Sequence, residues 1–172
     1  MNTLDAILTR RSIRSFTPEP IPNEIMQTII QAAAAAPSGG NAQNWCFISI
    51  CDPQRIQALR ALSPGIIGNP AAVIVLCIDK DRVTDTKEGD LAQMVLIDLG
   101  AAMQNILLSA HALGYGGCAI GSYHKQAVAR FLKLPENLDI RLLIVLGKPK
   151  HIPKCPPKRA LKEIYHQEQY RE

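Results

Sequence analysis

The residues best suited to binding a flat polar ligand lie in one short stretch, residues 36–45, with the sequence APSGGNAQNW. Pro37 ends an alanine-rich apolar segment, and the glycines at 39 and 40 free the backbone for dihedrals that other residues avoid. Three carboxamides follow within four residues. A carboxamide can both donate to and accept from the edge of a heterocycle. Taken alone, the stretch is also compatible with an ordinary turn between a helix and a strand.

Positive charge gathers at both ends of the sequence. Residues 1–14 carry three basic and one acidic side chain, residues 148–172 carry seven and three, and residues 15–147 carry nine and eleven. Because chain termini often lie close together, and because guanidinium groups match phosphate oxygens, we expect one anion site formed by both ends. Two solvated basic surfaces or a weak nucleic-acid patch are the alternatives. Nucleic acid is disfavoured because no aromatic platform or recognition-helix pattern accompanies the charge.

A second glycine-rich segment, GYGGCAIGS at residues 114–122, follows a long apolar stretch. It has neither the strand–GxGxxG–helix order of a dinucleotide site nor the Gly-Lys-Ser/Thr of a Walker loop. Its backbone amides can still donate to a ligand. Cys118 is better explained as a buried thiol than as a redox group. The five cysteines and four histidines lack metal-ligand spacing, so we expect no metal site and a reduced, cytoplasmic protein.

The elements that must position these residues alternate between helices and strands. Hydrophobic periodicity predicts helices over residues 3–11, 23–35, 53–62, 88–113 and 125–132, with a short one near 160–166. It predicts strands over residues 45–51, 71–78, 114–122 and 140–146. In the first helix the apolar stripe is Leu4, Ile7 and Leu8, and Pro22 is expected to begin the second. The pattern indicates one layered α/β or α+β domain over residues 1–172, ending in a tail at 158–172.

The stretch over residues 88–113 is apolar on more than one face. Such a helix is buried, either in a core or against another chain. We expect it to contribute to an interface, with a fully buried central helix as the alternative. The chain has no run of about 18 apolar residues and no signal-peptide order at its N-terminus, so no membrane span is expected.

Four motifs, in this order along nearly the whole chain, resemble the FMN-dependent nitroreductase family. They are RRSIRSF at 10–16, the 36–45 loop, DLGAAMQNILLSAHALGYGG with CAIGSY at 98–123, and PPKRALKEI at 156–164. The resemblance implies a three-layer α+β sandwich with a mixed, mainly antiparallel sheet flanked by helices. It also implies a homodimer with two FMN sites at the subunit interface and the long helix at its centre.

The resemblance further implies which residues hold the flavin. The first motif would bind the ribityl phosphate and the pyrimidine side through Arg10, Arg11, Ser12 and Arg14. The closing motif would supply a basic pair for the phosphate, Lys158 and Arg159. The glycine loop would reach the partner subunit's flavin through Pro37, Ser38 and Asn41. The turn at Gly121 and Ser122 would donate a backbone amide toward flavin N5, and Asp98 would lie near the ring. Contacts from residues 63–69 do not align.

The implied activity is hydride transfer from NADH or NADPH through flavin N5 to a nitroaromatic, quinone or related small-molecule acceptor. One site serving both substrates implies ping-pong kinetics, without a side-chain nucleophile or a metal. The alternatives are a flavin-binding or flavin-delivering protein without turnover, and a specialised member that fragments flavin or removes halogen. The sequence identifies neither the acceptor nor the preferred nucleotide, because the regions 65–69 and 84–90 that would shape the acceptor pocket are short.

Overall fold

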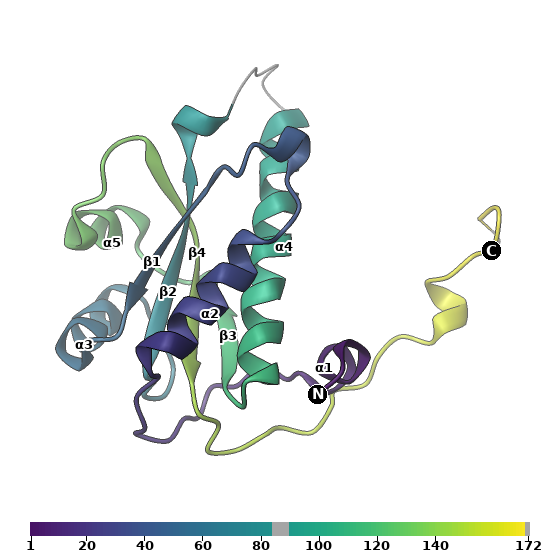
Figure 1. The fold of residues 1–172 in the computed structure, drawn as a ribbon, viewed down its shortest axis with the longest axis horizontal. Coiled ribbons are helices and arrows are strands. Elements are labelled where there is room, and N and C mark those ends of the chain that lie inside the picture. Colours follow the sequence, from purple (N-terminus) through teal and green to yellow (C-terminus); the bar gives the residue numbers. More distant parts are fainter. Residues whose placement is uncertain (84–89, 171–172) are drawn as a thin grey trace.

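The computed structural model describes residues 1–83 and 90–170, and its centre is a four-stranded sheet between two layers of helices (Figure 1). The strands are β1 Trp45–Ile50, β2 Ala72–Asp79, β3 Gly116–Ile120 and β4 Leu138–Gly147. They lie in the order β1-β2-β4-β3, with every neighbouring pair antiparallel. The helices are α1 Thr3–Thr9, α2 Asn23–Ala34, α3 Pro53–Leu62, α4 Asp90–Ala112 and α5 Lys125–Leu132. The predicted α+β architecture with a mainly antiparallel sheet is confirmed, and the parallel pairing seen in the described residues is an isolated bridge between Ser12 and Gly117.

Strand β2 is buried on both faces, as its unbroken apolar sequence predicts. Val73, Val75 and Cys77 pack into a cluster with α3 and α5. Ile74 and Leu76 alternate with them and pack into a second cluster with α2 and α4. The period-two alternation of one strand therefore joins two cores, which gives the three-layer sandwich.

The helix boundaries follow from local chemistry. The Asn2 side chain accepts a hydrogen bond from the first turn of α1, and Asp52 does the same for α3, which begins with Pro53. Helix α4 ends just before Gly114, whose φ of +83° is the left-handed conformation that glycine adopts after a helix.

Three expectations for the elements need correction. Helix α1 ends at Thr9, and its apolar stripe faces solvent, with Leu4 and Leu8 about two-thirds exposed and Ala6 alone buried. Pro22 caps α2 from outside it, because the first helical residue is Asn23. The tail forms only a 3₁₀ turn, η3 Leu161–Glu163. Residues 84–89, which include part of the expected acceptor region and of the long helix, lie outside the described residues.

Helix α4 buries one side and exposes the other. Val95, Leu99 and Ile106 pack against α2 and the sheet, whereas Met94, Leu96 and Ile97 are 45–63% exposed. Against expectation, Met94–Ala112 is long and apolar enough to cross a membrane by length and composition. Core helices pass the same test, and this segment is 39% buried within the protein.

The segment after β4 first follows the N-terminal chain and then leaves the body of the molecule (Figure 1). Thr17 donates its N–H to the Lys148 carbonyl, and Lys150 donates to the Ser15 carbonyl. These hydrogen bonds bring the two basic ends of the chain to the same side. Residues 151–165 beyond them are exposed, including large apolar side chains such as Ile152 and Leu161.

Candidate functional site

A cavity of about 390 Å³ lies between the N-terminal basic segment and the beginning of the tail. Its lining residues are Arg10, Arg11, Ser12, Arg14, Pro153, Lys154, Cys155, Pro156 and Lys158. Five cationic side chains therefore converge on one cavity, hereafter the basic pocket. The pocket therefore brings together residues from the two basic ends of the sequence, residues 1–14 and 148–172.

The wall of the basic pocket is shaped by an extended segment beside β3. Ile13 donates its N–H to the Gly117 carbonyl at 3.0 Å, and its side chain is buried in the core. Since alternate residues of an extended chain point to opposite sides, Ser12 and Arg14 turn toward the pocket. Gly116 is needed here because a Cβ at that position would overlap the Ile13 side chain.

The arginines of this wall are only partly satisfied by the protein. Arg11 donates from Nη1 to the Leu8 and Arg10 carbonyls at 2.9 and 2.8 Å. Arg10 Nε is buried and has no hydrogen-bond partner among the described residues. A buried donor without an acceptor costs about 1–3 kcal/mol, and an anion in the pocket would be attracted by the guanidinium charge. The pocket is therefore chemically suited to a phosphate or another multiply charged anion.

His111, near the end of α4, contacts the base of the same segment. The Thr9 hydroxyl donates its single proton to the Asp5 carbonyl, so His111 Nε2 is the donor in the 2.8 Å contact with Thr9 Oγ1. Burial, and then the charges of Arg10 and Arg11, hold the pKa of His111 below its ordinary value. The sequence analysis missed this contact, because nothing in the local pattern pairs residue 111 with residue 9.

The tail contributes differently from expectation. Lys158 lines the basic pocket, but Arg159 does not. Its guanidinium turns to Glu163, with Nη2 donating to the carbonyl at 2.9 Å. Lys154 takes part in the pocket instead, and the only sequence signal for it was the net charge of the tail.

The glycine loop, residues 37–44, lies at the other end of α4 (Figure 1). Pro37, Ser38 and Asn41 are in this loop, far from the basic pocket of the same chain. Gly40, Asn41 and Gln43 have φ values of 56°, 56° and 48°, so three residues here are left-handed. Asp98 lies buried beneath the loop and accepts from the Gly39 N–H and from Asn44. A cavity of about 270 Å³ separates the loop from α4, lined by Gly39, Gly40, Ala42, Asn44, Arg82, Val83, Met94, Val95 and Asp98.

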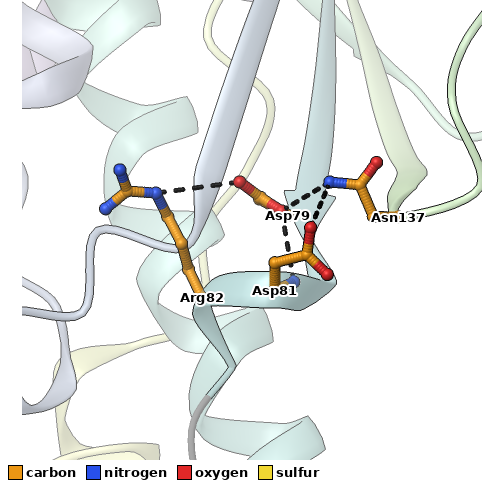
Figure 2. A network of polar contacts seen from close by, with 4 residues as sticks. All are labelled: Asp79, Asp81, Arg82 and Asn137. Carbon is orange, nitrogen blue, oxygen red and sulfur yellow. Dashed lines mark hydrogen bonds and ion pairs between the residues drawn. The ribbon is translucent and has the colours of Figure 1, made fainter.

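A polar network holds the chain where β2 ends beside this loop (Figure 2). Asn137 Nδ2 donates to Asp79 Oδ1 at 3.1 Å and to Asp81 Oδ2 at 2.8 Å. Asp79 also receives the Asp81 N–H and lies 3.7 Å from Arg82 Nε. Its backbone N–H donates to the Asn44 carbonyl at 2.9 Å, so the network also fixes the end of the glycine loop.

The turn at Gly121 and Ser122 follows β3 and is connected to the basic pocket by residues 63–69. Gly65 donates its N–H to the Ser122 carbonyl at 3.2 Å, while a Cβ on Gly68 would overlap the Arg14 carbonyl. A Cβ on Gly121 would meet nothing within 4 Å, so its backbone is open to a ligand. The sequence analysis could not place residues 63–69, although their two glycines are typical of close backbone approach.

Neither metal nor thiol chemistry is assembled in the part of the chain that the structure describes. No group of three or more potential metal ligands occurs among those residues. All five cysteines are free, and Cys118 is buried as expected. Burial, with Cys46 and Asp139 nearby, raises the pKa of Cys77 to about 12, which makes this thiol unreactive at neutral pH.

Comparison with known proteins identifies relatives of this chain. Residues 7–65 and 55–148 match the nitroreductase family. The chain is 35% identical to an NADPH-flavin oxidoreductase of Vibrio harveyi over 99% of its length and 75% of that protein. It is 31% identical to an oxygen-insensitive NADPH nitroreductase of Salmonella typhimurium over 98% of its length and 74% of that protein.

Solved structures agree with the sequence matches. The NADPH:FMN oxidoreductase from Vibrio harveyi complexed with NAD+ superimposes with a TM-score of 0.86 and 33% identity, covering 100% of this chain and 79% of that one. Nitroreductase A from Vibrio parahaemolyticus gives a TM-score of 0.87 and 32% identity, covering 100% and 78%. The chain therefore belongs to the nitroreductase family.

Proposed function

We propose that this protein is an NAD(P)H-dependent flavin oxidoreductase that holds FMN with its phosphate in the basic pocket. The observation that carries the proposal is the convergence of five cationic side chains on that pocket, in a chain whose relatives are named as flavin oxidoreductases and FMN reductases. The acceptors are nitroaromatic, quinone or related small molecules.

The residues present are suited to FMN. Arg10 lines the pocket, and its guanidinium charge would attract a phosphate. Ser12 adds a hydroxyl on the same wall, and Lys158 adds a cation from the tail. In the same proposal Arg159 contributes long-range charge, because its side-chain hydrogen bonds go to Glu163. The open backbone at Gly121 leaves room for a flat ring.

The flavin, when bound, supplies the redox chemistry by taking a hydride from the nicotinamide and delivering electrons to the acceptor. The protein's part is to bind and orient. Arg10, Arg11 and Arg14 stabilise negative charge, and the backbone amides at Gly121 and Ser122 donate toward the reacting edge of the ring. Because one site receives both substrates in turn, the kinetics are ping-pong.

We further propose that the working unit is a homodimer. Asp98 under the glycine loop and His111 beside the basic pocket are separated by roughly 20 Å along α4, so one chain does not join the two halves of the site. An antiparallel second copy packed on the exposed side of α4 would bring the loop of one chain to the pocket of the other. The exposed Met94, Leu96 and Ile97 support this packing.

Mixed dimers test the shared site. Arg10→Gln and Asn41→Ala are each expected to weaken FMN binding in homodimers. A mixed dimer recovers one intact site, because Arg10 of one copy and Asn41 of the other then meet. Recovery of about half of the tight sites in the purified mixed dimer, or about one quarter in a fully exchanged equimolar mixture, supports the shared site, and no recovery contradicts it. A stable Ile97→Glu monomer that keeps FMN at full affinity would also overturn it.

The phosphate assignment is tested with FMN and riboflavin side by side. Lys158→Gln should raise the Kd for FMN at least tenfold but leave that for riboflavin unchanged, since riboflavin has no phosphate. Arg141→Gln is the matched control, because Arg141 pairs with Asp139 outside the pocket. If the Kd for FMN and the Kd for riboflavin rise by the same factor, the phosphate does not bind in the basic pocket. Failure of NADH and NADPH to bleach the bound flavin anaerobically would refute turnover and leave a flavin carrier.

The remaining parts of the proposal concern the whole chain. We treat residues 1–172 as one flavin-binding domain that ends in the tail at 158–172. Five free thiols support a reducing, cytoplasmic location. A proteolysis experiment that released a stable fragment shorter than residues 1–157 would contradict the single domain.

A further inference from the structure

We infer that Asp98 is a positioning residue that holds the glycine loop in its flavin-binding conformation by accepting hydrogen bonds on either side of the loop's left-handed segment, residues 40–43. The inference rests on the proposed function and concerns a side chain that the sequence resemblance placed near the flavin ring. In the structure Asp98 lies beneath the loop, 6% exposed, on the side of α4 that packs into the protein.

The loop backbone is strained between two residues that both bond to Asp98. Gly40, Asn41 and Gln43 are left-handed, and a non-glycine residue in that conformation costs roughly 1–2 kcal/mol. Gly39, just before this segment, donates its N–H to both Asp98 oxygens at 3.3 Å. Asn44, just after it, donates from Nδ2 to Asp98 Oδ2 at 3.2 Å. Strain of this kind persists only where the surroundings over-determine the conformation, and Asp98 fixes both boundaries.

The other contacts of the loop cannot replace this one. Ser38 Oγ accepts from the Gln43 N–H at 3.0 Å, but Ser38 belongs to the loop and moves with it. The Asn44 carbonyl accepts from the Asp79 N–H, which anchors only the far end. Asn44 itself is 2% exposed, so its amide depends on a buried acceptor. Without Asp98, the Gly39 and Asn44 donors would lack that acceptor, and a relaxed loop would lower the number of unpaired groups.

The role assigned to Asp98 is that of an acceptor rather than that of a charge. Asn44 Oδ1 is buried without a partner among the described residues. In an Asp98→Asn protein the new amide oxygen can keep the Gly39 N–H. The new NH₂ group can then donate to Asn44 Oδ1 after the Asn44 amide turns over. Asp98→Asn is therefore the conservative variant that should restore what Asp98→Leu removes.

The experiment measures FMN affinity and unfolding free energy for three variants and the wild type. Asp98→Leu should raise the Kd for FMN at least tenfold, while Asp98→Asn stays within about threefold of wild type. Leu99→Ala is the matched control, because Leu99 is buried on the same helix in the α2–α4 core. It should lower the urea midpoint of unfolding, because it leaves a cavity in that core, without changing the Kd beyond threefold. Equal losses of affinity in Asp98→Leu and Leu99→Ala, or none in Asp98→Leu, would overturn the inference.

Amide exchange supplies a second readout that does not depend on flavin. In the wild-type protein the Gly39 N–H should be protected from hydrogen exchange, although Gly39 is exposed. An Asp98→Ser protein, whose shorter side chain cannot reach both donors, should lose that protection at least tenfold. An unprotected Gly39 in the wild type contradicts the inference even if FMN binds. Absence of FMN binding to the wild type refutes the proposed function instead, and the exchange result still decides the role of Asp98.

Discussion

Gly68→Ala should cost more stability and more flavin affinity than a comparable glycine substitution elsewhere. Gly68 has a φ of +74°, so an alanine there pays roughly 1–2 kcal/mol for the left-handed conformation. Its Cβ would also lie closer than 3.0 Å to the Arg14 carbonyl, a separation that real Cβ atoms avoid. Either residues 66–69 or the Arg14 wall of the basic pocket must then move. Overpacking of this kind adds about 1–3 kcal/mol.

Gly114→Ala is the matched control. Gly114 has a φ of +83°, but a Cβ there would meet nothing within 4 Å. It therefore carries the conformational cost without the collision. We expect about 1–2 kcal/mol of destabilisation for Gly114→Ala and about 2–5 kcal/mol for Gly68→Ala. For a chain of this length each kcal/mol lowers Tm by roughly 2–4 °C.

The assays are urea unfolding of the flavin-free proteins and titration of FMN by fluorescence quenching. Gly68→Ala should raise the Kd for FMN about tenfold, because the Arg14 segment is displaced, whereas Gly114→Ala should leave it within threefold. Equal changes for the two variants, in stability and in affinity, would show that the contact between residues 68 and 14 does not shape the basic pocket.

Three further predictions concern pH, thiols and the second glycine turn. The pKa of His111 lies below its ordinary 6.5, so between these values the unfolded chain binds more protons and stability falls as pH falls. His111→Gln keeps a donor for Thr9 without titrating, and urea unfolding at pH 8 and 5.5 should show a smaller loss at pH 5.5 than the wild type shows. Ellman's reagent at pH 8 should modify the exposed Cys155 quickly, Cys51 more slowly because partial burial raises the pKa of its thiol, and the buried Cys77 only after unfolding. Gly121→Ala should change the unfolding free energy by less than about 1 kcal/mol while weakening FMN binding, measured by the same titration.

Each of these has a contrary result. Parallel pH dependences for wild type and His111→Gln would mean that His111 does not supply the loss at low pH. Rapid native-state modification of Cys77, located by mass spectrometry of the labelled peptide, would contradict its burial. Wild-type FMN affinity in Gly121→Ala would mean that the open space at Gly121 is not occupied by the ligand.

Much of the fold could be predicted because its signals are local. The unbroken apolar run of β2, the Asp52–Pro53 start of α3 and the glycine after α4 each predict an element without reference to the rest of the chain. The outward face of α1 could not be predicted, since Leu4 and Leu8 carry the same apolar pattern whether they face a core or solvent. Whether another part of the chain packs on this face decides between them, and that is a tertiary property.

The site was predictable to the extent that residue type implies a ligand. Arginines and a lysine at the two ends of the sequence suggested an anion site, and the hydrogen bonds between residues 15–17 and 148–150 explain how they meet. Contacts between residues far apart in the sequence could not be predicted where the local sequence around each residue is unremarkable. Asp98 with Gly39, and His111 with Thr9, are pairs of this kind. Each resembles a surface polar residue of a helix until the partner element is in place.

Helix α4 carries one residue of each of these two contacts, Asp98 with Gly39 and His111 with Thr9. Near its N-terminal end Asp98 holds the glycine loop, and near its C-terminal end His111 holds the segment that leads into the arginines of the basic pocket. A rigid helix between them fixes the separation of the two half-sites at roughly 20 Å within one chain. In the proposed dimer the same length sets how far the loop of one copy reaches along the other, because the two helices run antiparallel. The helix would thus act as the spacer that makes two incomplete half-sites match, which gives Asp98 and His111 a common role.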